Sequence, residues 1–290
     1  MKSLPIMASV LFMVTACGGG GGDAPVAPAA PTITGVSVSA PNNGQVTLTA
    51  SATAGVNAFC IKATDTLPLA DDNCFSASSN LAINTPATPT RYFVWGKNSA
   101  NTVTTVFERV VGNCSVAGVT ASQASSLPTV CVSTSLGEMV IALESTKAPI
   151  TTTNFLRYVN DGFYSQTVFH RVISNFMIQG GGYTPTGAYK TTGLKAPIVL
   201  EPTTVTGLSN TRGTIAMART SDFDSATSQF YINVVDNVAN TNNNLDGSSG
   251  YAVFGQVISG MATVDAIRYT PVTGSVPNVL PIINWSYQLK

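Results

Sequence analysis

The sequence predicts a mostly-β protein that contains two folded domains. At 290 residues the chain has room for two domains of ordinary size. Short runs of alternating apolar residues recur along most of its length, whereas helical periodicity is confined to two stretches in the second half. Many strands with few helices favour a sandwich or barrel architecture.

The composition excludes several classes of function. Charged residues make up only 10% of the chain and the formal net charge is zero, so nucleic acid is a poor partner, because its binding depends on clustered Lys and Arg. His170 is the only histidine, which excludes a multi-histidine metal site. We expect neither a metal nor a cofactor.

The first 16 residues have the pattern of a secretory signal peptide. Lys2 is followed by the apolar run Leu4–Val14, which is too short for a membrane span of about 20 residues. The sequence VTAC that ends at Cys17 resembles a bacterial lipobox, in which cleavage leaves a lipidated cysteine. An ordinary signal peptide that is cleaved nearby is the alternative. Gly18 follows the cysteine, and by resemblance to sorted lipoproteins this favours the outer membrane, facing the periplasm.

Residues 17–30 are expected to form a tether, flexible in its glycine run and stiffer in its Ala- and Pro-rich part. Residues 31–112 are expected to form a small, immunoglobulin-like β-sandwich, because short strands recur between turn signals such as Asn42-Asn43-Gly44. Trp95 is expected in its core. The predicted strands are Ile33–Ser39, Gln45–Ala52, Ala58–Ala63, Arg91–Lys97 and Val103–Val111.

Four cysteines follow Cys17, and an even number in an exported chain suggests two disulfides. Three connectivities are possible, of which proximity in the sequence favours Cys60–Cys74 and Cys114–Cys131. Reduced, buried thiols are the alternative. Because the chain contains no Cys-x-x-Cys pair, the sequence gives redox catalysis no support.

Residues 113–129 are rich in Ser, Ala and Gly and are expected to form a connector, and residues 130–290 the second domain. A helix is expected to begin near Pro149, since proline is tolerated in a first turn, and to end at Asp161-Gly162. The remaining expected elements are a hairpin of Val130–Thr134 and Glu138–Leu143, strands near Gly213–Arg219, Gln229–Val234, Val253–Val257 and Ile282–Tyr287, a helix over Met261–Ile267, and loops at Tyr183–Leu208 and Pro271–Pro281.

The most specific stretch is FHRVISNFMIQGGG, residues 169–182. Successive side chains of a strand point to opposite faces, so Arg171 cannot share one alternation with both Phe176 and Met177. The Ser-Asn pair between them must therefore bend the segment, after which Met177 and Gln179 share one face. One cation, one amide and a large apolar surface would then lie close together.

This stretch resembles the signature of cyclophilin-type peptidyl-prolyl isomerases, in which many residue types fall at fixed offsets. The likeness continues through Asn210–Arg219, Ser225–Asn233 and Val253–Val257. It covers roughly residues 130 to 290 and is greatest to the short bacterial members. The resemblance implies a closed eight-stranded antiparallel barrel with a helix at each end.

The resemblance also implies catalysis of rotation about X–Pro bonds, which needs no nucleophile, metal or cofactor because no bond is made or broken. Arg171 would aim charged donors at the prolyl nitrogen, and Gln179 would hold a backbone group of the substrate. The resemblance further implies which residues bind the proline ring and the substrate residues that precede it. These are Phe176, Met177, Tyr231, Leu245, Tyr251, Ala218 and Gln229.

Three positions depart from the family pattern. Asn244 stands where vertebrate-type members carry a tryptophan, and Tyr251 stands for their histidine, so cyclosporin-type macrocycles are expected to bind weakly. Tyr231 replaces the usual phenylalanine, and its hydroxyl is expected to narrow the pocket or to bond the substrate. Catalysis is expected to survive these changes.

Three other features suggest chemistry that we reject. His170 matches a structural histidine of the family and is expected to be packed and hydrogen-bonded rather than to act as an acid or base. The glycine run 180–182 lacks the ending of a phosphate-binding loop, so we expect it to bend the backbone. Residues 242–253 mimic the start of a calcium loop but end in Val253, where a bidentate Glu belongs.

The predicted function is that of a lipid-anchored, monomeric peptidyl-prolyl cis-trans isomerase of the bacterial envelope that assists the folding of exported polypeptides. One alternative is a cyclophilin-fold protein that binds proline-containing segments without turnover. Another is that the sandwich is the functional part, as an adhesion or envelope-binding scaffold.

Overall fold

The computed structural model describes residues 31–39, 41–238, 241, 243–247 and 250–290. The predicted signal peptide, the lipidation site Cys17 and the tether lie outside these residues. In the described part of the chain, none of the helices combines the length and the apolar character that a membrane span requires.

The first half of the described chain forms two antiparallel sheets that share one core. One sheet has the order β1-β2-β4 and the other β3-β5-β6. Apolar residues of both, among them Leu48 and Val94, form a single buried cluster, as a sandwich requires. The bounds are β1 Ile33–Val38, β2 Gln45–Ala52, β3 Val56–Lys62, β4 Asn80–Asn84, β5 Thr90–Asn98 and β6 Phe107–Val111.

The prediction for the disulfides is confirmed, and Trp95 is buried as expected. Trp95 is 1% exposed, but it packs with Phe93 and Cys60 in a cluster separate from the core that the two sheets share. The disulfides are Cys60–Cys74 and Cys114–Cys131, as proximity suggested. In a chain-entropy model each closure of a loop of this length stabilises the fold by about 3 kcal/mol.

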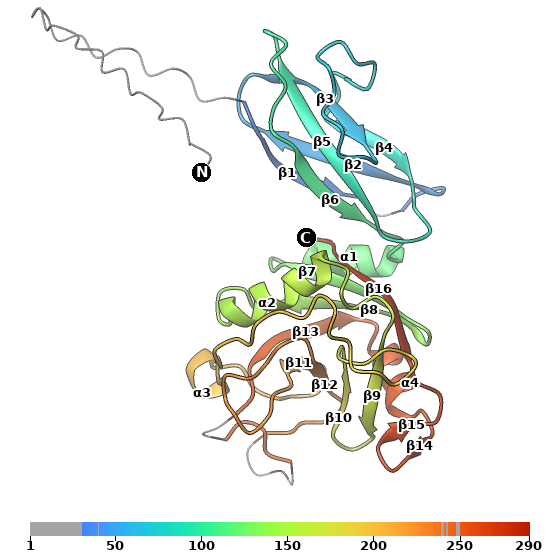
Figure 1. Ribbon diagram of the computed structural model, residues 1–290, viewed down its shortest axis with the longest axis vertical. Coiled ribbons are helices and arrows are strands. Elements are labelled where there is room, and N and C mark those ends of the chain that lie inside the picture. Colours follow the sequence, from blue (N-terminus) through green and yellow to red (C-terminus); the bar gives the residue numbers. More distant parts are fainter. Residues whose placement is uncertain (1–30, 40, 239–240, 242, 248–249) are drawn as a thin grey trace, which may run out of the picture. The chain divides into compact units, whose positions relative to one another are not determined.

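The second half of the chain forms a closed antiparallel barrel, as predicted (Figure 1). The strand order around the barrel is β10-β12-β11-β13-β8-β7-β16-β9. Closure leaves no unpaired sheet edge. The bounds are β7 Thr129–Thr134, β8 Gly137–Leu143, β9 Thr167–Ile173, β10 Met177–Gly180, β11 Thr214–Met217, β12 Phe230–Asn233, β13 Val253–Ser259 and β16 Ile282–Gln288.

The two expected helices of the barrel domain are α2, Pro149–Asn160, and α4, Met261–Arg268. Helix α2 packs on β13 and β16, and α4 packs on β8, β9 and β10. Pro149 occupies the first turn of α2, as the sequence predicted. Within the loop 183–208 the structure adds a single short turn of helix, α3, Thr203–Thr206.

The expected connector, residues 113–129, contains a helix that the sequence did not predict, α1, Val116–Ala124. Its buried residues, Gly118, Val119 and Ser122, make no strong apolar stripe, so periodicity does not reveal the helix. The helix is instead stabilised at its start. The Ser115 hydroxyl accepts a bond from the Gly118 amide (3.1 Å), and the Ser115 amide donates to the Glu138 carboxylate (2.9 Å).

Two smaller elements also differ from expectation. Strand β4 was not predicted, since its five residues, NLAIN, have few apolar positions to mark an alternation and it pairs only with β2. The expected loop 271–281 contains a short hairpin of β14, Val272–Thr273, and β15, Val276–Pro277.

Helix α2 is capped by a residue that is distant in the sequence. Its N-cap, Ala148, offers no side-chain acceptor. The Glu201 carboxylate takes this place and accepts bonds from the amides of Ile150 (3.1 Å) and Thr151 (2.8 Å) and from the Thr151 hydroxyl (2.6 Å). A negative charge at the start of a helix also interacts favourably with the helix dipole.

We therefore expect Glu201→Gln to lower the free energy of unfolding by about 1 kcal/mol, because it removes the charge and one acceptor oxygen from the cap. Urea denaturation of the purified protein would measure the loss. Glu108→Gln is a matched control, since Glu108 forms an exposed ion pair with Arg91 that should contribute less than about 0.5 kcal/mol. Equal losses in the two variants would contradict the capping role.

Candidate active site

The candidate site is organised by the register of four adjacent strands. Arg171 of β9 lies opposite Gln179 of β10, Gln179 lies opposite Tyr231 of β12, and Tyr231 lies opposite Ala216 of β11. Residues that are directly opposite in a sheet have their side chains on the same face. The sheet therefore presents one cation, one amide and one aromatic ring in a single row.

The same strands bury apolar residues on both faces. Ile178, Ile215 and Phe230 belong to the barrel core, whereas their neighbours Met177, Ala216 and Tyr231 belong to a separate cluster on the other face. This second cluster forms the floor of a pocket of about 210 Å³. The pocket is lined by Arg171, Phe176, Met177, Gln179, Ala218, Arg219, Tyr231, Leu245 and Tyr251.

The pocket unites nearly all of the predicted site residues. The expected bend also lies where the sequence placed it, since β9 ends at Ile173 and β10 begins at Met177. Gln229, which was predicted to line the groove, lies next to the pocket and is bonded to Gln179. Arg219 also lines the pocket. It was assigned no role from the sequence, although it lies within the family motif Asn210–Arg219.

Three polar side chains form a continuous chain beside the pocket. The guanidinium of Arg171 donates to Oε1 of Gln179 (3.3 Å), and Nε2 of Gln179 donates to Oε1 of Gln229 (3.0 Å). Gly182 allows this arrangement, because a Cβ at that position would lie 2.4 Å from Cγ of Gln229. The chain fixes the orientation of the arginine, which is otherwise exposed.

The glycine run at the end of β10, residues 180–182, serves close packing. Gly181 has a φ of +81°, a conformation that favours glycine, and a Cβ there would lie 2.9 Å from the rings of Phe230 and Tyr164. The prediction that the run bends the backbone is therefore confirmed.

The hydroxyl of Tyr231 is bonded behind the pocket floor. It donates to Oδ1 of the fully buried Asn210 at 2.8 Å. Burial raises the pKa of the Tyr231 phenol well above its usual value, so the hydroxyl stays protonated and remains a donor. The hydroxyl was expected to narrow the pocket or to bond the substrate; its hydrogen is directed to Asn210, so it is not free to donate to a substrate.

The rim of the pocket carries an aromatic and cationic stack. The Tyr251 ring meets the Tyr231 ring edge-on at 5.6 Å, and the Arg219 guanidinium lies 4.7 Å from the centre of Tyr251 and 4.8 Å from that of Phe223. Asn244 is exposed and is not part of the lining. The rim on that side is formed by Leu245 instead.

His170 is adjacent to Arg171 but does not share its face, since neighbouring residues of a strand alternate. Its ring lies 4.5 Å from the Tyr183 ring. Burial, with a smaller contribution from the Arg171 charge, lowers the pKa of His170 to about 4. The imidazole is therefore neutral near pH 7, in agreement with the packed role that the sequence predicted.

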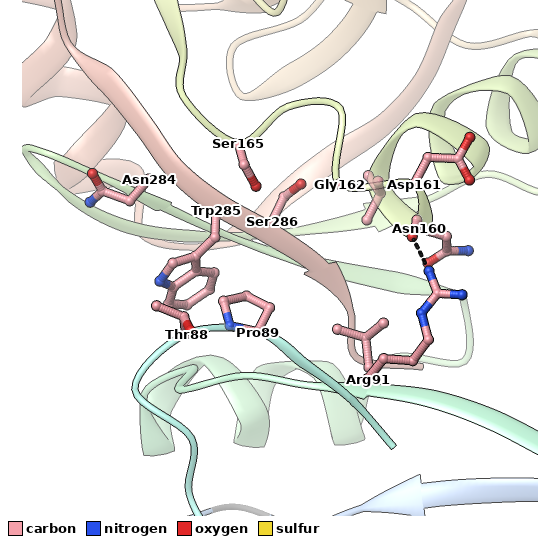
Figure 2. A pocket seen from close by; sticks show the side chains of 12 residues that line it. Thr88, Pro89, Arg91, Asn160, Asp161, Gly162, Ser165, Asn284, Trp285 and Ser286 are labelled. Atoms are coloured by element: carbon pink, nitrogen blue, oxygen red, sulfur yellow. Dashed lines mark hydrogen bonds between the residues drawn. The ribbon is translucent and has the colours of Figure 1, made fainter. Parts of the chain in front are cut away.

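Figure 2 shows another pocket, of about 380 Å³, which lies beside Trp285 and Ser286 of β16. Its charged side chains are already engaged. Arg91 donates to the Asn160 carbonyl (3.2 Å) and pairs with Glu108, and Asp161 pairs with Lys195 (2.5 Å). We therefore do not assign a function to this pocket.

One group of potential metal ligands, Cys114, Cys131 and Glu138, has its ligand atoms within 4.8 Å of one another. The two cysteines form a disulfide and the carboxylate caps α1, so these three residues do not form a metal site.

Comparison with known proteins points to a single family. The family described as cyclophilin type peptidyl-prolyl cis-trans isomerase/CLD matches residues 129–286. A peptidyl-prolyl cis-trans isomerase of Acinetobacter baylyi is 54% identical over 140 residues, which are 48% of this chain and 71% of that protein. Peptidyl-prolyl cis-trans isomerase B of Escherichia coli is 51% identical over 139 residues, 47% of this chain and 80% of that protein.

Among solved structures, a cyclophilin type peptidyl-prolyl cis-trans isomerase of Cryptosporidium parvum, in the presence of the dipeptide Ala-Pro, has a TM-score of 0.45 and 26% identity. The alignment covers 55% of this chain and 97% of that one.

The depressed pKa of His170 predicts a specific pH dependence of stability. Between about pH 6.5 and pH 4 the unfolded chain binds a proton at His170 that the folded chain does not, so the free energy of unfolding should fall as the pH falls through this window. His170→Gln should lose this contribution. Urea denaturation of both proteins at several pH values would measure the difference. Parallel pH profiles would contradict the assignment.

Proposed function

Because the chain belongs to the cyclophilin-type peptidyl-prolyl cis-trans isomerases, we propose that Arg171 and the pocket beside it accelerate rotation about X–Pro bonds in exported polypeptides. The barrel domain is a peptidyl-prolyl cis-trans isomerase, and proline-containing peptides are its substrates. The observation that carries the assignment of the site is the row of Arg171, Gln179 and Tyr231 across three paired strands.

Amide resonance opposes the reaction with a barrier of about 20 kcal/mol, and uncatalysed isomerisation takes about 10–100 s. As the bond twists, the lone pair of the prolyl nitrogen is released from resonance and becomes a hydrogen-bond acceptor. The guanidinium of Arg171 donates to that lone pair in the twisted state and not in the planar ground state. Such differential stabilisation lowers the barrier. Each tenfold increase in rate requires about 1.4 kcal/mol of additional transition-state stabilisation.

The pocket holds the ring while the preceding carbonyl swings. Phe176, Met177 and Leu245 supply apolar walls, and the Tyr231 ring supplies the floor. Gln179 both restrains Arg171 and offers hydrogen-bonding groups to the substrate backbone. Because the proline ring is held in place, only the part of the peptide that precedes the proline rotates about the bond.

The second part of the proposal concerns location and organisation. Cleavage before Cys17 and lipidation of that residue would tether the protein to the envelope, at the outer membrane and facing the periplasm, where exported chains fold. The disulfides Cys60–Cys74 and Cys114–Cys131 support an oxidising compartment. The sandwich then serves as a spacer or accessory binding module of a monomer.

Arg171→Ala should lower kcat/KM for a peptide with a central Ala-Pro bond by about 100-fold, equivalent to roughly 2.7 kcal/mol of transition-state stabilisation. Arg171→Lys should recover little, because it keeps the charge but loses the planar fork. Relaxation of the cis peptide, followed optically or by NMR exchange, measures the rates. Arg91→Ala, at the exposed ion pair in the sandwich, is the matched control and should be unaffected. Full activity of the Arg171→Ala variant would contradict the proposal, because a different group would then accelerate the rotation.

Cys17→Ser should release the protein from bacterial membranes into the soluble periplasmic fraction, because the sulfur that would carry the lipid is lost. Gly18→Asp should move the anchored protein from outer-membrane to inner-membrane fractions. Fractionation and immunoblotting measure both outcomes, and peptide turnover should be unchanged in each variant. Retention of Cys17→Ser in the membrane fraction after removal of its first 16 residues would disprove the lipid anchor.

A further inference from the structure

Three buried asparagines lie behind the proline pocket and are bonded to one another. Asn210, Asn233 and Asn237 are each 0% exposed. Nδ2 of Asn237 donates to Oδ1 of Asn233 at 2.7 Å, and Nδ2 of Asn233 donates to Oδ1 of Asn210 at 3.1 Å. Buried amides that are linked in this way form a single cooperative network.

Three of the residues that line the pocket, Tyr231, Phe176 and Leu245, are attached to this network. The Tyr231 hydroxyl donates to Oδ1 of Asn210 (2.8 Å), and Nδ2 of Asn237 donates to the Phe176 carbonyl (2.8 Å). The Leu245 amide donates to the Asn237 carbonyl (2.8 Å), and the Leu245 carbonyl accepts from Nδ2 of Asn210 (3.3 Å).

The network matters most for two walls that belong to no strand. Phe176 lies in the turn between β9 and β10, and Leu245 lies in the irregular segment that follows β12. Phe176 is held at the end of the ladder by one further bond, from the Val234 amide to its carbonyl (3.2 Å), and Leu245 lies outside the ladder. Asn237 is the residue that contacts both of them, through its side-chain amide on one side and its backbone carbonyl on the other.

We propose that Asn237 is a positioning residue for the isomerase reaction, which holds the Phe176 and Leu245 walls at the separation that accepts a proline ring. The inference depends on the proposed role of this pocket as the X–Pro site. Asn237 touches neither the substrate nor Arg171, and it acts through the two walls.

This role has a distinct kinetic consequence. If the pocket is correctly formed in only a fraction of the molecules, the apparent affinity for the peptide falls by that fraction, while a bound peptide still meets Arg171. KM therefore rises and kcat is largely retained. A purely structural role predicts the opposite, because partial unfolding removes active enzyme and lowers the apparent kcat at unchanged KM.

Asn237→Asp is the most direct test, since it preserves the shape of the side chain and removes both N–H donors. It also places an oxygen opposite the Phe176 carbonyl and Oδ1 of Asn233. With an Ala-Pro tetrapeptide as the probe, we expect KM to rise about tenfold and kcat to stay within about twofold. Asn237→Ser, which introduces no charge and keeps one shorter donor, should raise KM about threefold and serves if the aspartate variant does not fold.

Two controls separate this role from lost stability and from added charge. Val159→Ala removes buried volume from α2 in the barrel core, so it should lower stability without changing KM. Asn160→Asp makes the same chemical change at an exposed position. An unchanged KM in the folded Asn237 variants would overturn the inference. Absence of any acceleration by the wild-type protein would instead contradict the proposed function on which it rests.

Discussion

The pairing register of β9, β10 and β12 is the constraint on which the candidate site depends. It places Arg171, Gln179 and Tyr231 in one row, and a slip of one residue in any of the three strands would turn a side chain to the opposite face. Closure of the barrel protects this register, because each strand is paired on both sides and none can slide without breaking two ladders. The geometry of the cation relative to the apolar floor is therefore a property of the whole barrel.

The same sheet explains why these strands are apolar at almost every position. One set of side chains, including Phe230, fills the barrel, and the alternate set, including Tyr231, forms the floor of the pocket. The glycines after β10 complete this arrangement, since Gly182 lets Gln229 approach the backbone and restrain Gln179. The barrel core and the candidate site thus use opposite faces of one set of strands.

Alternation along the sequence predicted a mostly-β second domain, and the resemblance to the family, which is carried by a motif with fixed offsets, implied the barrel and most of the pocket. The sequence did not predict helix α1, whose stability comes from Glu138 on a later strand and from a disulfide rather than from its own periodicity. It also left open whether the Tyr231 hydroxyl narrows the pocket or bonds the substrate, and did not predict its bond to Asn210. The bond from that hydroxyl to Asn210 joins residues 21 positions apart, and no local pattern marks such a contact.

The most direct test of the central claim is a crystal structure of the protein with an Ala-Pro peptide bound. The account predicts that the proline ring lies against the Tyr231 ring and between Phe176 and Leu245. The Arg171 guanidinium should then lie within about 3 Å of the prolyl nitrogen or of the carbonyl group that precedes it. A peptide bound elsewhere on the barrel, or one with its ring in this pocket and Arg171 turned toward solvent, would contradict the account.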